Sequence, residues 1–96
     1  MKTSDILCSI QGALLGRVTP NLRAVTVDTT ENKLILYFYY DKSPTEDEQE
    51  LSSLADTDFI ADFPFQTDCK VVTLPYPQKV PKADLYAYHR FEGEMA

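Results

Sequence analysis

One histidine and two cysteines are the side chains of this sequence best suited to catalysis. His89 is the only histidine, so a Ser-His-Asp, Cys-His or multi-histidine metal arrangement would have to include it. It stands beside Arg90 with no nucleophile near it in sequence. Cys8 and Cys69 belong to no CxxC pair, and we expect both to be small, free core residues. We therefore predict no enzyme, no metal and no cofactor; an unfamiliar enzyme would need His89 to meet a carboxylate in a pocket.

Carboxylates are more informative, because eight of the fifteen acidic residues lie between Asp41 and Asp62. This segment has one basic residue, Lys42, and so sums to −7, whereas the rest of the chain carries eight basic and seven acidic side chains. Charge concentrated in this way attracts a cationic partner and repels nucleic acid and anionic membranes. The pattern indicates a protein-binding surface, with neither nucleic acid nor membrane as the partner.

The acids of this segment differ in how far local structure explains them. Near a helix start, Glu46, Asp47 and Glu50 suit the helix dipole, so a solvated, well-capped helix is the alternative to a binding role. Asp58 and Asp62 fall near the helix end, where the dipole disfavours them, and either an internal arginine (Arg17, Arg23 or Arg90) or an external cation must compensate them. The candidate partner contacts are Glu46, Asp47, Glu50, Asp56, Asp58 and Asp62, together with Tyr37 and Tyr39.

The two tyrosines belong to the clearest strand of the chain, Lys33 to Tyr40. Successive strand residues point to opposite faces, so Tyr37 and Tyr39 share one face and Phe38 and Tyr40 the other. One pair should pack on the helices. The opposite pair is either an exposed interface anchor or is covered by the proline-rich segment that follows later in the chain.

Six elements position these side chains. A helix from Ser4 or Asp5 to Gly16 precedes a hairpin of two strands, and a capping box at Ser43-Pro44-Thr45-Glu46 starts a second helix that stops at Pro64. Residues 75–81 contain three prolines and should project as a long hairpin loop between the last two strands. The four expected strands are Leu22–Asp28, Lys33–Tyr40, Cys69–Leu74 and Leu85–Phe91.

This order predicts an α+β fold, α-β-β-α-β-β, with an antiparallel four-stranded sheet and two helices packed on one face. A three-stranded sheet with the last strand docked elsewhere is the alternative. At 96 residues the chain is a single domain, 1–96, with an ordered core of about 4–91 and a frayed tail after Gly93. No apolar run approaches the ~20 residues of a membrane span, and no signal peptide is recognisable, so we expect a cytoplasmic protein.

Several stretches of the sequence resemble a group of small bacterial proteins. They are Ala13 to Val25, Leu36 to Asp41, Ile60 to Pro64 and Leu74 to Pro77, so the resemblance covers about residues 5 to 82. Some members of the group are similar to immunity proteins of contact-dependent growth inhibition and related toxin systems. The resemblance implies a cytoplasmic protein that binds a cognate toxin domain, and it transfers no site residues.

The charge pattern and the resemblance together predict an immunity protein that neutralises a basic, nuclease-type toxin domain through its acidic surface. A small acidic housekeeping or regulatory domain with no toxin partner is the alternative. Neither observation predicts the oligomeric state.

Overall fold

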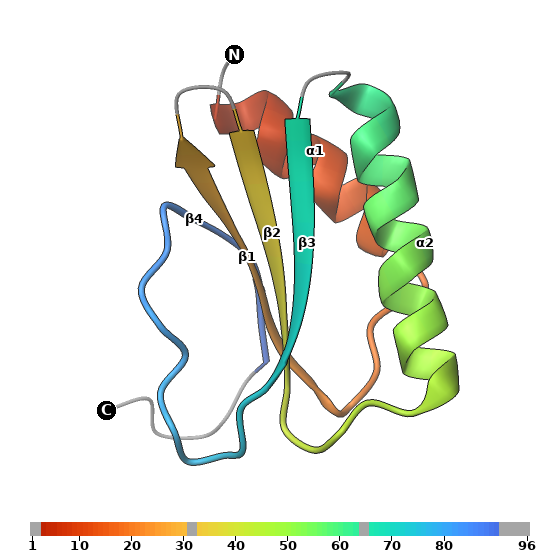
Figure 1. The fold of residues 1–96 in the computed structure, drawn as a ribbon, viewed down its shortest axis with the longest axis vertical. Coiled ribbons are helices and arrows are strands. Elements are labelled where there is room, and N and C mark those ends of the chain that lie inside the picture. Colours follow the sequence, from red (N-terminus) through yellow and green to blue (C-terminus); the bar gives the residue numbers. More distant parts are fainter. Residues whose placement is uncertain (1–2, 31–32, 64–65, 91–96) are drawn as a thin grey trace.

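The computed structural model describes residues 3–30, 33–63 and 66–90. Within these ranges the element order confirms the predicted α-β-β-α-β-β arrangement (Figure 1). The predicted end of the fourth strand at Phe91, the helix stop at Pro64 and the tail lie outside the described residues. The elements are α1 (Thr3–Leu14), β1 (Leu22–Thr30), β2 (Lys33–Tyr40), α2 (Glu46–Asp62), β3 (Gln66–Thr73) and β4 (Leu85–His89).

The four strands form one mixed sheet in the order β3-β2-β1-β4. The predicted hairpin of β1 and β2 is confirmed, and β4 also pairs antiparallel with β1. However, β3 runs parallel to β2, so the prediction of an entirely antiparallel sheet is wrong. The reason is α2, which carries the chain back along the sheet, so that Gln66 at the start of β3 lies opposite Lys33 at the start of β2.

The connection between β3 and β4 is not a hairpin loop, because these two strands lie at opposite edges of the sheet. Residues 74–84 instead pass from one edge to the other (Figure 1). Hydrogen bonds hold both ends of this crossing segment: Arg23 donates to the Leu74 carbonyl at 2.7 Å, and Asp84 accepts from the Thr29 amide at 2.8 Å. The three prolines predicted an extended connection, but they carried no information about where it leads.

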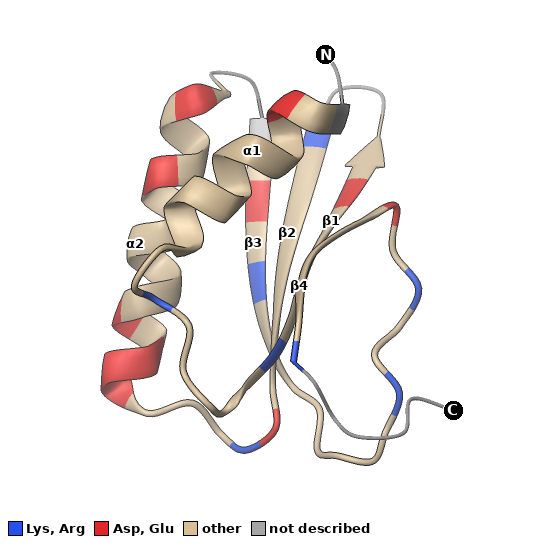
Figure 2. Ribbon diagram, turned by 180° about the vertical axis from the view of Figure 1, so that it is seen from behind, with Lys and Arg blue, Asp and Glu red and all other residues tan. Residues whose placement is uncertain are grey.

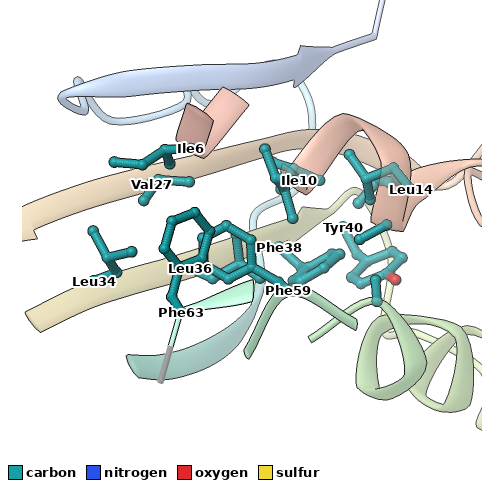
Figure 3. Close-up of a cluster of buried hydrophobic side chains, with 14 residues drawn as sticks. Ile6, Ile10, Leu14, Val27, Leu34, Leu36, Phe38, Tyr40, Phe59 and Phe63 are labelled. Atoms are coloured by element: carbon teal, nitrogen blue, oxygen red, sulfur yellow. The ribbon is translucent and has the colours of Figure 1, made fainter. Parts of the chain in front are cut away.

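A single cluster of buried side chains joins both helices to the sheet (Figure 3). On β2 the buried members alternate, so we call the face that carries Phe38 and Tyr40 the helix-side face and the opposite one the open face. One aromatic pair packs with the helices, as predicted, and the structure shows that this pair is Phe38 and Tyr40. Helix residues in the cluster are Ile6, Ile10, Ala13 and Leu14 of α1, Ala55 and Phe59 of α2, and Phe63 just after α2.

Two local predictions about the helices are wrong. Cys8 is exposed, because the buried stripe of α1 lies on the opposite side of that helix, although Cys69 does pack against the core. The capping box of α2 is formed by Thr45 and Glu48, two residues later than the predicted one. The Thr45 hydroxyl accepts from the Glu48 amide at 3.1 Å, and the Glu48 carboxylate accepts from the Thr45 amide at 3.0 Å.

Candidate partner-binding site

The first turns of α2 carry three exposed acids, Glu46, Asp47 and Glu50, which we call the acidic turn. Within the described ranges, none of the three forms an ion pair with another side chain. Glu46 and Glu50 are four residues apart and so project from the same side of the helix, with Asp47 beside them. Acidic residues recur along α2, and its last turn has no basic residue (Figure 2).

Glu48, the fourth acid of these turns, is a structural residue. Its side chain is buried and accepts hydrogen bonds from Thr19, Asn21 and the Thr45 amide. Burial alone would raise the pKa of Glu48, but the hydrogen bonds, that from Thr19 foremost, outweigh burial and lower this pKa. Glu48 therefore ties the start of α2 to the segment before β1 and fixes the direction in which the acidic turn points.

Asp58 and Asp62, near the end of α2, both contact α1 or the residues just after it. Arg17 forms an ion pair with Asp58, so of the two expected alternatives the internal arginine applies to this residue. Asp62 has a hydrogen bond instead of an ion pair, because the Ser9 hydroxyl donates to its carboxylate. Both carboxylates thus help to hold the helices together, and part of Asp58 still faces solvent, with 56% of its side chain exposed.

Asp56 lies apart from the acidic turn. It is nine residues after Asp47, about two and a half helical turns, and so projects from the opposite side of α2. There its charge lies within electrostatic range of Asp68 and Cys69 of β3, and its Oδ1 atom is buried without a hydrogen-bond partner among the described residues. Burial, followed by the charge of Asp68, raises the pKa of Asp56. A flat partner that covers the acidic turn cannot also reach this carboxylate.

Tyr37 and Tyr39 lie on the open face, turned away from both helices. Their rings stack with centroids 5.9 Å apart and planes 11° from parallel. Tyr39 is buried, whereas Tyr37 is only partly so. Burial, and then the neighbouring Tyr37, raise the pKa of Tyr39. Tyr37 therefore offers more surface to a partner than Tyr39, and both point in a different direction from the acidic turn.

A shallow depression of about 650 Å³ borders the acidic turn at Asp47. Apolar surface from Pro20 and Leu51 forms part of it, and Arg90 and Asp41 form an ion pair at its rim. A hydrogen bond from the Tyr76 amide is the main reason why the pKa of Asp41 is lowered. The depression thus combines an apolar surface with an ion pair, next to the exposed acids of the acidic turn.

The side chains with catalytic potential do not come together in the part of the chain that the structure describes. His89 Nδ1 lies 2.9 Å from the Arg90 carbonyl oxygen, and no hydrogen bond joins this ring to a described carboxylate. Burial raises the pKa of Cys69 to about 12. Among residues 3–30, 33–63 and 66–90, no three His, Cys, Asp or Glu side chains are grouped to hold a metal, and no helix is long and apolar enough to cross a membrane.

Two exposed side chains of interest were not among the predicted contacts. Val71 of β3 is 44% exposed although it belongs to the helix-side face, and Tyr86 of β4 is 48% exposed on the open face. The alternation of β4 could have singled out Tyr86. Nothing in the sequence could have singled out Val71, because its exposure follows from the position of β3 at the sheet edge.

Comparison with known protein families matches residues 3–92 to a family described as MafI2 immunity protein. A search of curated proteins finds no match. The family match covers the acidic turn, the open face and every described element, and it confirms the resemblance to toxin-immunity proteins seen in the sequence. Membership of such a family implies a cognate toxin as the partner. The protein belongs to the MafI2 immunity protein family.

Proposed function

We propose that this protein neutralises a cationic, nuclease-type toxin domain in the bacterial cytoplasm, and that the acidic turn of α2 makes the first contact. The observation that carries this proposal is the exposure of Glu46, Asp47 and Glu50 without internal cations among the described residues. Family membership favours this role over that of an acidic housekeeping domain.

Electrostatics connect the acidic turn to a nuclease. An enzyme that holds a phosphate backbone needs lysine and arginine where the nucleic acid lies, so its active-site groove attracts a compact group of carboxylates. Such attraction raises association rates by roughly 10 to 10³-fold at low salt. The depression beside Asp47 gives the aliphatic stem of a lysine or arginine a place to pack while its charge reaches the carboxylates.

The test uses the cognate toxin domain, to be sought among the genes that neighbour the gene of this chain. Cells that produce the toxin domain should stop growing, and co-production of this chain should restore growth. The purified toxin domain should degrade RNA or DNA, and an equimolar amount of the chain should abolish this activity. A toxin domain that binds the chain but degrades neither nucleic acid contradicts the nuclease assignment, and one that the chain does not bind contradicts the proposed function.

The acidic turn is tested by two variants of equal net charge. Neutralising it with Glu46→Gln, Asp47→Asn and Glu50→Gln changes the formal charge from −6 to −3. The control, Asp5→Asn, Gln11→Lys and Gln78→Lys, reaches the same net charge through three other exposed positions. The first variant should protect cells less well than the control. Equal protection by the two removes the acidic turn from the interface.

A further inference from the structure

The free edge of β3 is the longest unpaired backbone edge in the described sheet. All eight residues of β3 pair with β2 without a bulge, and no strand pairs with the other side of β3 within the described ranges. Alternate amide and carbonyl groups of such a strand point outward. The opposite edge is less regular, since β4 has five residues and its register with β1 shifts between Val25 and Thr26.

The charged side chains of β3 do not project beside its free edge, where they would hinder the pairing of another strand. Exposed strands are commonly protected by lysines and acids that project beside them. Here both charged residues of β3 lean back over β2 on the open face: Asp68 forms an ion pair with Lys33 at 2.6 Å, and the Lys70 ammonium lies 5.9 Å from the Tyr37 ring centroid. On the helix-side face the edge presents Val71, which is 44% exposed.

The carboxylate of Asp56 favours a positively charged side chain at this edge. This carboxylate lies within electrostatic range of Asp68 and Cys69 of β3, and Oδ1 is buried without a hydrogen-bond partner among the described residues. Asp68 is already paired with Lys33, and the Cys69 thiol is neutral at physiological pH because its pKa is about 12. A lysine or arginine that arrived along this edge would meet an unpaired carboxylate.

We propose that an extended segment of the cognate toxin domain adds to the free edge of β3 as a fifth strand, with a basic side chain directed at Asp56. This inference rests on the proposed function and specifies how the toxin is held. Main-chain hydrogen bonds give such strand additions their affinity, and side-chain contacts give them specificity.

The location of β3 supports this mode of binding. The acidic turn belongs to α2, whereas Tyr37 lies on the open face, so one flat partner surface cannot cover both. The edge of β3 lies between them, because β3 adjoins β2 on one side and packs with α2. A toxin domain anchored by a strand at this edge can extend over α2 and over the open face together.

Residue-resolved amide hydrogen exchange tests the added strand. In the free chain, every second amide of β3 should exchange rapidly because it points outward. In a complex with a catalytically inactive toxin domain, these same amides should slow by at least about tenfold, whereas β4 amides keep their rates. Unchanged β3 exchange, in a complex that protects other amides, overturns the strand addition and leaves the proposed function standing. Failure of the toxin domain to bind at all overturns both.

The charge preference is tested by Asp56→Asn, with Asp5→Asn, an exposed position on α1, as the control of equal charge change. Asp56→Asn should weaken toxin binding about tenfold or more, the low end for the loss of one desolvated charge pair, and Asp5→Asn should leave the affinity within a factor of two. Equal affinities of the two variants overturn the assignment of a basic side chain to Asp56.

Discussion

Asp56, Asp58 and Asp62 lie on one helix, but their carboxylates meet different surroundings. Arg17 pairs with Asp58, and Ser9 donates to Asp62, so these two acids are used within the fold. Asp56 has no such partner among the described residues, and burial raises its pKa. The charged form of Asp56 is therefore costly to the fold, and a carboxylate at this position is better explained by a partner than by stability.

We predict that Asp56→Asn stabilises the free protein at pH 7, because the neutral amide avoids the cost of desolvating a negative charge at this site. The pKa of Asp56 is higher in the folded than in the unfolded chain, so protonation favours folding. As the pH falls through this raised pKa, the free energy of unfolding of the native chain should therefore rise relative to that of the variant. Urea unfolding of both chains between pH 7 and pH 4 measures the difference.

The control for this prediction is Asp62→Asn, which replaces the charged acceptor of the Ser9 hydroxyl by a neutral and weaker one and should not stabilise the chain. A variant Asp56→Asn that is less stable than the native chain at pH 7 would show that the carboxylate has a favourable partner. In combination with weaker toxin binding, the predicted gain in stability identifies a residue kept for the interface.

At the scale of the elements, the start of α2 depends on which residue caps it. The sequence contains two overlapping capping patterns, Ser43 with Glu46 and Thr45 with Glu48, and the structure uses the second. This choice follows from contacts distant in sequence: Thr19 and Asn21 bind the Glu48 carboxylate and hold it at the helix start. Such contacts are invisible to a reading of local pattern.

Thr45→Ala should lower the free energy of unfolding by about 1 kcal/mol, the usual loss for an N-cap threonine. This corresponds to a fall of roughly 4–8 °C in the melting temperature of a chain of this size. Ser43→Ala should have almost no effect, because Ser43 is exposed and outside the cap. Thermal unfolding followed by circular dichroism compares the two, and a larger loss for Ser43→Ala would contradict the observed cap.

Strand existence was predictable from the sequence, but strand direction was not. Alternation identified β1 and β2, and their short connection identified the hairpin. The same alternation in Leu85 to His89 does not say which edge of the sheet that strand joins, so the expected β3–β4 hairpin was wrong. At the candidate site, the sequence left an internal arginine and an external cation open for Asp58, of which the structure shows the arginine. The sequence could not separate Asp56 from the acidic turn, because this requires knowing where β3 lies.

At the scale of the whole molecule, charge is unevenly distributed. Acidic bands follow α2, whereas the crossing segment of residues 74–84 carries Lys79 and Lys82 on the other side of the molecule (Figure 2). A molecule with this separation of charge is oriented by a cationic partner before contact, with α2 leading. Orientation of this kind acts on the rate of association and is weakened by salt.

The association rate constant of the chain with its toxin domain, measured from low to high salt, shows whether the acidic turn makes the first contact. At low salt, Glu46→Gln with Asp47→Asn and Glu50→Gln should slow association about tenfold and flatten its salt dependence. The control of equal net charge, Asp5→Asn with Gln11→Lys and Gln78→Lys, should keep a steep dependence and a rate closer to that of the native chain. Identical rate constants and salt slopes for the two variants would show that the acidic turn does not steer association.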